Sequence, residues 1–356
     1  MKKSNLQKKQ IKYLISNIIF SAIALAALTI CVVFILINYS LRNQISLSEK
    51  VNSELEEYNA THIYTQEDMD TQELRIREEE NDKEKKLLLD DIKEIVENGY
   101  SPYYLFRELY PNDVVVMTNE GYTFFPILDE LNLNTYVRDN FKEDEVTKEI
   151  TYVDDNQNVL SKKGIDVSSF NGDIDWKKVK ADGVEFAFIR LGFRGSTEGK
   201  LSLDTKFEDN MNGAIDNGID VGVYFYTQAV DEAEAVEEAE FVLEAISDFD
   251  ITYPVVFDIE EYEGGRADKL SRDKYTQITQ SFCNRITEGG YKPMIYGNLK
   301  TMFVMLDLTK LKDYPKWFAY YSYPVYFPYE FDYWQYSSSG KVKGIEGTVD
   351  MNILVK

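Results

Sequence analysis

Residues 161–356 alternate apolar, strand-like segments with helix-like segments, and this pattern constrains the fold more than any other feature of the chain. The apolar segments are rich in β-branched and aromatic residues, which is typical of buried strands. Repeated β–α units of this size predict an α/β fold, an irregular TIM-like β/α barrel, irregular because little helix separates the last strands. Strands are expected at 164–170, 185–193, 220–228, 253–260, 292–298, 317–322, 331–337 and 348–354, and helices near 202–217, 231–248 and 271–289.

The stretch Tyr253–Glu263, reading YPVVFDIEEYE, changes abruptly from apolar to acidic. Because side chains on a strand alternate between faces, Asp258 and Glu260 are expected on one face and Ile259 on the other. Like charges this close raise one pKa, and partial burial adds to that shift. The pair would then offer one acid that is still protonated near neutrality beside one that is ionised, as a glycosidase requires. A solvated acidic loop that caps the strand is the alternative.

Two further acids stand where strand-like segments run out, Asp166 in the first segment and Asp350 in the last. If a barrel closes, its first and last strands become neighbours, and chemistry in such barrels gathers at the C-terminal ends of the strands. Four acids from three distant segments would then face one cleft. Since an isolated buried aspartate is costly, this convergence favours a functional site over separate turn or cap roles.

Composition excludes several other kinds of chemistry. The formal net charge of −23 argues against a nucleic-acid partner, because phosphate binding needs clustered Lys and Arg. The single histidine, His62, lies outside the barrel segment, so histidine-dependent triads and histidine-ligated zinc are excluded there. Cys31 and Cys283 make no disulfide framework, and no Gly-rich phosphate loop is found. No cofactor and no metal are expected, and carboxylates must carry the chemistry.

The N-terminus has the pattern of a membrane anchor. Residues 1–12 are basic and form a predicted cytoplasmic tail, and the apolar run over 13–38 is long enough to cross a bilayer as a helix. The basic flank places the N-terminus in the cytoplasm, which predicts a single-pass protein of the cell membrane with an extracytoplasmic catalytic domain. A cleaved signal peptide is the competing interpretation, but its apolar core would be shorter.

Residues 43–97 are highly charged and poor in Gly and Pro, and they are predicted to form a helical or coiled-coil stalk. A solvated, partly disordered spacer is the alternative, and self-association through the stalk is a further possibility. Residues 98–160 are expected to form a small α/β module or a linker, with a helix-like run at 101–109 and strand-like runs at 114–117 and 122–128.

The barrel segment also carries an ordered set of motifs. Residues 164–353 resemble the family 25 glycoside hydrolases, the lysozymes or muramidases that cleave peptidoglycan glycan strands. The motifs that carry the resemblance are GIDVSSFNG at 164–172, IDW at 174–176, PVVFDIE at 254–260, PMIYGN at 293–298, WFAYY at 317–321 and YWQYSSSGKVKGIEGTVDMN at 333–352. Their order and spacing are more specific than any one of them.

The resemblance implies an irregular barrel with an acidic groove that hydrolyses the β-1,4 bond between N-acetylmuramic acid and N-acetylglucosamine. Glu260 matches the family's proton donor, Asp258 matches the neighbour that tunes it, and Asp166 and Asp350 match the other two acids of the cleft. Many members carry Lys-x-Thr-Glu-Gly after the second strand, where this chain has Arg-Leu-Gly-Phe-Arg-Gly at 190–195. Substrate preference on that side is therefore expected to differ.

Aromatic residues that could line the groove and stack on sugars come from several strands, with one amide as a polar partner. Arg190 is a candidate for binding substrate carboxylates, or else forms an ordinary barrel salt bridge. A non-catalytic glycan-binding module and another barrel glycosidase such as a chitinase remain the alternative functions. The other expected groove residues are Tyr224, Tyr226, Tyr296, Trp317, Tyr320, Trp334 and Gln335.

Overall fold

The computed structural model describes the backbone of residues 2–61, 65–97, 106–107, 109–118 and 120–355, and most side chains from residue 30 onward. By its internal contacts the chain divides into two compact units, Met1–Glu94 and Ile95–Lys356. The helix-like run expected at 101–109 lies for the most part outside the described residues.

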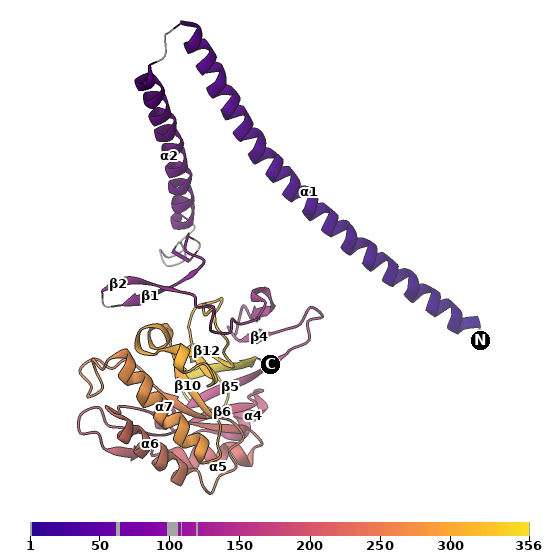
Figure 1. The fold of residues 1–356 in the computed structure, drawn as a ribbon. Coiled ribbons are helices and arrows are strands. Elements are labelled where there is room, and N and C mark those ends of the chain that lie inside the picture. The colour runs from indigo at the N-terminus through magenta and orange to yellow at the C-terminus, as the bar shows by residue number, and fades with distance from the viewer. Residues whose placement is uncertain (1, 62–64, 98–105, 108, 119, 356) are drawn as a thin grey trace. The chain divides into compact units, whose positions relative to one another are not determined.

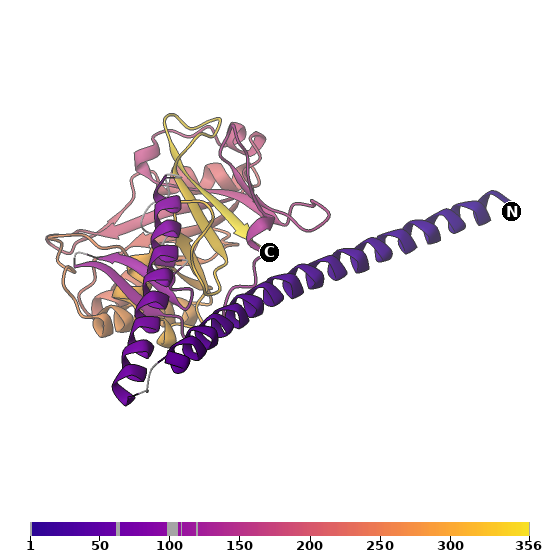
Figure 2. The same cartoon turned by 90° about the horizontal axis from the view of Figure 1, so that it is seen from above.

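Two helices account for the N-terminal unit. Helix α1 (Lys2–Thr61) runs without a break through the predicted anchor into the predicted stalk (Figure 1; Figure 2). Helix α2 (Gln66–Glu97) begins at Thr65, whose hydroxyl donates to Asp68 Oδ2 at 2.7 Å and accepts from the Asp68 backbone N–H at 3.3 Å. Such side-chain caps satisfy the free N–H groups of a first turn. Apart from Thr65, the described residues of the predicted stalk are therefore helical, in two helices.

The structure also bears on the predicted anchor. Among the residues with described side chains, the segment Ile30–Tyr58 of α1 is long and apolar enough to cross a membrane, with a mean hydropathy of 1.4. A signal sequence near an N-terminus meets the same criterion, so the helix supports either interpretation. Residues 13–29 of the predicted anchor are helical, but their side chains lie outside the described set.

The C-terminal unit is built on a closed barrel of eight strands. Each strand pairs with the next around the ring, and β5 pairs with both β6 and β13, which closes it. A short ninth strand, β7 (Leu201–Leu203), pairs with β6 outside the ring. All eight predicted strands are confirmed. In ring order they are β5 (Ser161–Val167), β6 (Phe186–Arg194), β8 (Asp220–Tyr226), β9 (Val255–Asp258), β10 (Pro293–Gly297), β11 (Lys316–Ala319), β12 (Tyr333–Gly340) and β13 (Val349–Val355).

The helices cover only part of the barrel. The three predicted ones are confirmed as α5 (Phe207–Asp216), α6 (Glu232–Ala245) and α7 (Arg272–Glu288), which lie on the outside of the strands in Figure 1. Asp231 and Ser271 cap α6 and α7 by accepting backbone N–H bonds at 3.0 and 3.2 Å. A six-residue helix, α4 (Trp176–Ala181), is too short to show helical periodicity in the sequence. Short helical turns lie at Ser169–Asn171, Thr301–Met305 and Leu308–Lys310.

The direction of β13 makes the barrel irregular. It runs antiparallel to both of its neighbours, β12 and β5, whereas the other adjacent pairs in the ring are parallel. Only residues 341–348 separate β12 from β13. A parallel return needs a crossover of about a dozen residues or more, so a link this short forces the chain to reverse. This reversal is the irregularity of the barrel, and it falls among the last strands, where little helix separates them.

Side chains of the barrel form two cores. Inward-facing residues such as Phe186, Phe188 and Trp317 fill the interior, while outward-facing residues pack under the helices. Room for the inner rings comes partly from glycine: a Cβ on Gly164 would lie 2.1 Å from the Phe186 ring, and one on Gly222 2.6 Å from the Phe188 ring. Alternation along each strand thus decides which aromatic residues can reach the barrel mouth.

Two β-hairpins from the preceding residues pack on the same barrel. The first pairs β1 (Asp113–Thr118) with β2 (Gly121–Pro126), and the second pairs β3 (Phe141–Glu143) with β4 (Ile150–Tyr152), after a turn at Arg138–Asn140. Strand β4 lies against β5 and β13, where a regular barrel would carry a helix. Phe141 meets the Trp334 ring edge-on at 5.4 Å, so the hairpins share the outer core of the barrel.

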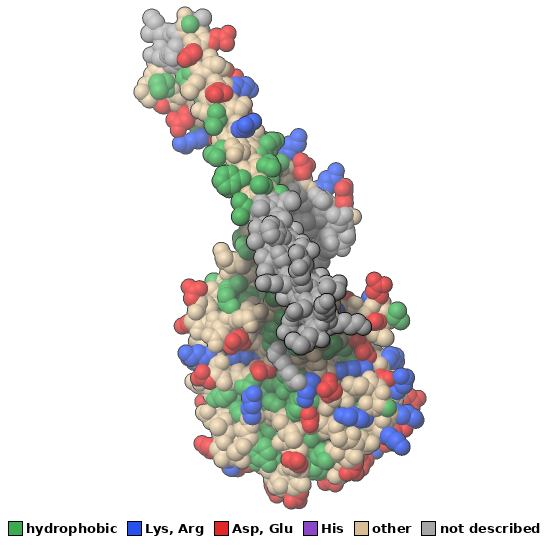
Figure 3. Space-filling view, turned by 90° about the vertical axis from the view of Figure 1, so that its right-hand side faces the viewer, with side chains coloured by type: hydrophobic (Ala, Val, Ile, Leu, Met, Phe, Trp, Pro, Cys, Tyr) green, Lys and Arg blue, Asp and Glu red, His purple; other side chains and the backbone are tan. Residues whose placement is uncertain are grey.

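Charges of both signs are spread over the surface of this unit. Figure 3 shows Lys and Arg side chains interspersed with Asp and Glu side chains on one face. Several of them form exposed ion pairs, such as Lys206 with Asp173 at 2.7 Å and Lys274 with Glu232 at 2.9 Å. Such exposed pairs contribute little to stability, but they distribute the charge.

Candidate active site

Four carboxyl groups line one cavity of about 550 Å³ at the mouth of the barrel. Asp166 lies near the C-terminal end of β5, Asp258 ends β9, and Glu260 follows two residues later. Asp350 is the second residue of β13 and not at its end, because that strand runs the opposite way. Antiparallel pairing puts Asp350 directly opposite Asp166, so both reach the same mouth. The structure therefore brings together all four acids singled out in the sequence.

Asp166 is held by a network of side-chain hydrogen bonds. Its Oδ2 accepts from Gln335 Nε2 and from Asn352 Nδ2, both at 2.8 Å. Gln335 Oε1 in turn accepts from the hydroxyls of Tyr296 and Tyr321, each at 2.7 Å. The Trp317 indole N–H donates to Asn352 Oδ1 at 2.7 Å. Since each amide oxygen is already occupied by a donor, both amides must present their N–H groups to Asp166.

Asp166 and Asp350 lie directly opposite each other in the β5–β13 pair, and each affects the pKa of the other. Burial and the neighbouring charge of Asp350 raise the pKa of Asp166, against the two amide donors that favour its ionised form. Burial also raises the pKa of Asp350, and a hydrogen bond to Asp166 acts in the opposite direction. Two neighbouring carboxyl groups cannot both ionise cheaply, so the ionised form of the pair is disfavoured.

Asp258 and Glu260 share a face, as strand alternation predicts, but their environments differ. Asp258 is 6% exposed, and its Oδ1 finds no hydrogen-bond donor among the residues that the structure describes. Burial, Glu260 and Asp166 together raise the pKa of Asp258. Glu260 is exposed to the cavity, yet surrounding protein displaces enough water to raise its pKa, with Asp350 adding to the effect. Glu260 is therefore the acid best placed to meet a ligand while protonated.

The raised pKa of Asp258 predicts how stability changes with pH. The folded state keeps this proton over a range in which the unfolded chain has lost it, so the free energy of unfolding falls as pH rises from about 5 to 7.5. Asn at this position cannot ionise. We expect Asp258→Asn to flatten that fall and to raise Tm at pH 7.5 by roughly 3 °C, the effect of about 1 kcal/mol in a domain of this size.

Thermal unfolding of the full chain at the two pH values measures this effect. Asp248→Asn is the matched control, because Asp248 is exposed in the link after α6 and its loss removes a charge without touching the cluster. A pH dependence of Tm that is equally steep in the Asp258→Asn and Asp248→Asn variants would contradict the prediction.

Arg190 lines the cavity and also makes a salt bridge. Its Nε and a terminal nitrogen lie 2.7 and 2.6 Å from Asp204 Oδ2. The guanidinium also donates a hydrogen bond to Ser169 Oγ at 3.1 Å. Burial alone would raise the pKa of Asp204, because it disfavours the charged form. Hydrogen bonds from backbone N–H groups and the charge of Arg190 outweigh burial and lower the pKa of Asp204. The ring of Phe170 lies 4.8 Å from the guanidinium carbon. Asp204 thus positions the Arg190 side chain, and the guanidinium borders the cavity.

The structure separates the expected groove residues into two sets. Tyr224, Tyr226, Tyr296, Trp317 and Gln335 line the cavity with the acids. Tyr320 does not; it lines a neighbouring cavity instead. Trp334 is wholly buried in the outer core and donates its indole N–H to the Tyr320 carbonyl oxygen at 2.7 Å. The expectation for Trp334 is wrong because β12 turns this residue outward, toward the hairpin that carries Phe141.

Further residues line the cavity that the sequence did not single out. Phe170 is 88% exposed at the mouth, and Tyr262 and Tyr321 are also more than half exposed. Exposed aromatic rings beside buried acids indicate a ligand site. This signal depends on which side chains are buried, so composition alone does not show it. Phe170, Tyr262 and Tyr321 lie just beyond the ends of β5, β9 and β11, where a ring has no core to enter. The complete set of additional lining residues is Phe170, Phe193, Tyr262, Tyr321 and Ser338.

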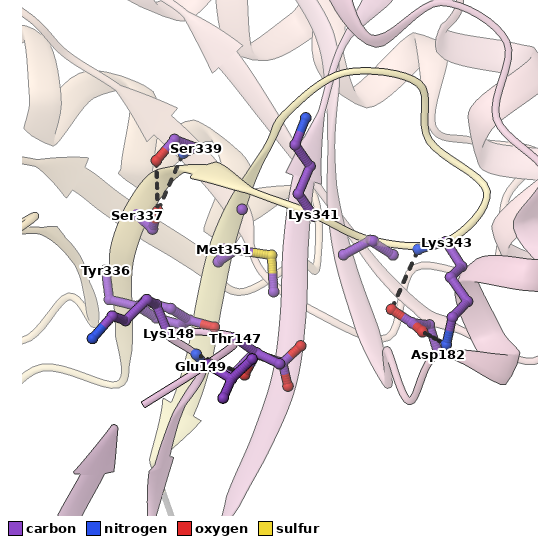
Figure 4. Close-up of a pocket in the computed structure, with 13 residues that line it drawn as sticks. Thr147, Lys148, Glu149, Asp182, Tyr336, Ser337, Ser339, Lys341, Lys343 and Met351 are labelled. Carbon is purple, nitrogen blue, oxygen red and sulfur yellow. Dashed lines mark hydrogen bonds and ion pairs between the residues drawn. The ribbon is translucent and has the colours of Figure 1, made fainter. Parts of the chain in front are cut away.

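A cavity of about 580 Å³ lies on the outer side of β12, away from the four acids (Figure 4). Strand alternation turns Ser337 and Ser339 into it, while Ser338 faces the acids. Its charged groups are already paired, for example Lys343 with Asp182 at 2.8 Å. Despite its size, this cavity contains no unpaired carboxyl of the kind found at the barrel mouth.

The acids at the barrel mouth do not form a group of metal ligands. Among the residues that the structure describes, no group of three or more His, Cys, Asp or Glu side chains is arranged to hold an ion. At Asp166, two amide N–H groups already donate to Oδ2, and such donors compete with a cation for that oxygen.

A closed β/α barrel with a glutamate of raised pKa beside further carboxyls at its mouth is the arrangement of a glycoside hydrolase. The chain belongs to glycosyl hydrolase family 25, whose pattern matches residues 165–345. This confirms the resemblance seen in the sequence motifs and the barrel that it implies.

Relatives with recorded names agree with this family. The autolytic lysozyme of Clostridium acetobutylicum is 31% identical over 193 residues, 53% of this chain and 55% of that protein. The uncharacterized protein YegX of Escherichia coli strain K12 is 30% identical over 199 residues, 53% of this chain and 68% of that protein. The chain therefore spans only about half the length of the autolytic lysozyme.

A solved structure shares the fold. The modular autolysin LytC of Streptococcus pneumoniae, in complex with a synthetic peptidoglycan ligand, aligns with a TM-score of 0.51 at 23% identity. The alignment covers 68% of this chain and 56% of that one. At this identity the likeness concerns the fold alone.

Proposed function

We propose that this chain is a membrane-anchored peptidoglycan muramidase that hydrolyses the β-1,4 bond between N-acetylmuramic acid and N-acetylglucosamine. The observation that carries the proposal is the gathering of Asp166, Asp258, Glu260 and Asp350 in one cavity with raised pKa values. Family membership and a relative named as an autolytic lysozyme support the substrate class.

Glu260 acts as the general acid in this proposal. It is open to the cavity and its pKa is raised, so it can protonate the leaving glycosidic oxygen near neutral pH. Asp258 lies beside it with a buried oxygen that lacks a donor, and this oxygen can accept a hydrogen bond from the substrate's acetamido N–H. Once Glu260 has given up its proton, the carboxyls can stabilise the positive charge that develops at the sugar.

The Asp166–Asp350 pair would limit the negative charge near Glu260. Because burial raises the pKa of both carboxyls, the pair carries less negative charge at a given pH than two exposed carboxylates would. The hydrogen bonds from Gln335 and Asn352 hold Asp166 in place, so the pair cannot swing toward solvent. Attack at the anomeric carbon, by water or by the substrate's acetamido oxygen, is compatible with carboxyls placed this way.

Aromatic rings and Arg190 complete the proposed groove. Tyr224 and Tyr226 of β8 and Tyr296 of β10 line the cavity, and such aromatic surfaces suit the apolar faces of sugars. The guanidinium of Arg190 borders the cavity beside Phe170 and could bind the lactyl carboxylate of muramic acid.

The reaction is tested with the full chain in detergent and purified peptidoglycan. Mass spectra of the released fragments should show N-acetylmuramic acid at the new reducing ends, and pure N-acetylglucosamine polymers should be cut much more slowly. New ends that carry N-acetylglucosamine would contradict the bond assignment. Binding to peptidoglycan without cleavage at any pH would favour a glycan-binding module, and rapid cleavage of chitin would favour a chitinase.

We further propose that the apolar part of α1 anchors the enzyme in the cell membrane with the barrel outside. A tethered enzyme would cut the wall only near the membrane. Cell fractionation measures this: the full-length chain should sediment with membranes and be released by detergent. Activity found mainly in the culture fluid, with an N-terminus trimmed beyond Ser40, would show that the apolar segment is a cleaved signal.

A further inference from the structure

A second cavity, of about 540 Å³, adjoins the acid-lined one. The two share three lining residues, Glu260, Tyr296 and Tyr321. The groove therefore continues past the general acid proposed above and does not end there. The wall farthest from the barrel is supplied by Val116 and Met117 of β1.

Strand β1 lies outside residues 165–345, which match the family, so this wall is an addition particular to the preceding hairpin. Contacts with the barrel fix its position. The Val115 backbone N–H donates to the Tyr326 hydroxyl at 3.1 Å, and that hydroxyl donates to the Asp113 carbonyl oxygen at 3.2 Å. Arg107 stacks on the Tyr326 ring at 3.3 Å and donates to the Tyr320 hydroxyl at 2.5 Å. The wall is thus held rigidly against the segment that follows β11.

The lining of this second cavity combines apolar and polar groups. Met117 is 51% exposed and, with Leu299 and Ala319, gives the apolar part. Asn298 accepts the backbone N–H groups of Lys300 and Thr301 through its Oδ1, at 2.9 and 3.1 Å. Its amide oxygen is thereby fixed inward, which leaves the amide N–H₂ of this exposed residue as a donor. Lys300 and Glu261 form an ion pair at the rim.

This combination matches an N-acetylated sugar. The apolar groups can contact a ring face or an acetamido methyl, and the Asn298 amide can donate to a hydroxyl or an acetamido carbonyl. Continuity with the acid-lined cavity through Glu260 points to the same glycan strand rather than a separate ligand.

We propose that the β1–β2 hairpin builds an additional sugar-binding site, which holds the glycan strand beyond the bond that is cut. This inference rests on the proposed function for the identity of the strand. The additional site makes the chain selective for long glycan strands, because short strands cannot fill both cavities.

Binding is measured apart from cleavage, so that the two proposals can fail separately. The full-length chain carrying Glu260→Gln is titrated by calorimetry with peptide-free tetra-, hexa- and octasaccharides of alternating N-acetylglucosamine and N-acetylmuramic acid. We expect affinity to rise with length, and Met117→Ala to weaken octasaccharide binding about fivefold while it changes tetrasaccharide binding less than twofold. The fivefold figure corresponds to loss of one partly exposed apolar contact.

Met69→Ala is the matched control. Met69 lies in α2 and is 52% exposed, nearly the same as Met117, and it should leave every affinity unchanged. Affinity that does not depend on length, or an equal loss at every length in Met117→Ala, would overturn the inference. If the loss appears only with glycans that still carry stem peptides, the site binds peptide and the sugar assignment is wrong. Failure of the chain without the Glu260→Gln change to cleave peptidoglycan would instead overturn the proposed reaction.

Discussion

Replacing Glu260 by Gln is expected to lower kcat on peptidoglycan about a thousandfold or more, with little change in glycan affinity. A positioned general acid contributes roughly 10²–10⁴ in rate, and the leaving sugar oxygen departs poorly without a proton. Gln keeps the size and polarity of the side chain but cannot donate that proton. Released reducing ends, measured over time with the full chain, give the rate.

The pH dependence of the rate tests the same assignment. Burial and Asp350 raise the pKa of Glu260, so the fraction of protonated acid, and with it the rate, should fall as pH rises through that raised pKa. The matched control is Glu263→Gln, three residues further on and exposed outside the cavity. If Glu260→Gln and Glu263→Gln cleave at the same rate, Glu260 is not the acid.

Replacing Arg194 by Met is expected to lower the free energy of unfolding by about 3–5 kcal/mol. Arg194 is 3% exposed, and its Nε lies 2.7 Å from the wholly buried carboxylate of Glu238. The same guanidinium donates to the carbonyl oxygens of Gly199 and Glu234 at 2.8 and 3.0 Å. Met fills the space of the arginine stem but leaves Glu238 buried without its counter-charge.

The ion pair between Arg194 and Glu238 joins two elements of the barrel unit. Arg194 ends β6 and Glu238 lies in α6, so the pair ties a helix to the barrel close to its mouth. Thr227 connects the two sites, because its hydroxyl donates to Glu238 at 2.7 Å and its backbone N–H donates to the Asp258 carbonyl oxygen at 3.0 Å. Loss of the pair should therefore loosen the strand end that carries Asp258.

Chemical denaturation followed by tryptophan fluorescence measures this loss in the barrel, because all three tryptophans, Trp176, Trp317 and Trp334, belong to it. The double variant Arg194→Met, Glu238→Leu should recover most of the stability, since replacing a buried pair costs far less than breaking it. Burial raises the pKa of Glu238 to about 7, although Thr227 and Arg194 act in the opposite direction. The single variant should therefore lose less stability at pH 5, where Glu238 can take up a proton. A loss below about 1 kcal/mol at pH 7.5 would contradict this account.

Local patterns were enough to predict several parts of the site. Period-two alternation led to the expectation that Asp258 and Glu260 lie on one side and Ile259 on the other; both acids line the cavity and Ile259 packs in the outer core, although β9 ends at Asp258. The expectation that the first and last strands meet correctly paired Asp166 with Asp350, even though β13 proved antiparallel. Both inferences depend only on the geometry of a strand and on barrel closure, which hold whatever the neighbouring side chains are.

Other residues could not be placed from local patterns. Tyr333, Trp334 and Gln335 follow one another in β12, and only the closed barrel shows that Gln335 reaches Asp166 while Trp334 packs outward on Phe141. Tyr320 borders the second cavity because Arg107, more than two hundred residues earlier, holds its hydroxyl. These outcomes depend on contacts between distant segments, and no local spacing encodes them.

The sequence alone determined the alternation of strands and helices, the long apolar N-terminal segment and the four acids, because each follows from residue type and short-range periodicity. Tertiary structure decided the direction of β13, the raised pKa of Asp166 beside Asp350, and the extension of the groove by β1. The physical reason is that burial, hydrogen-bond partners and cavities arise only when segments far apart in the chain pack together.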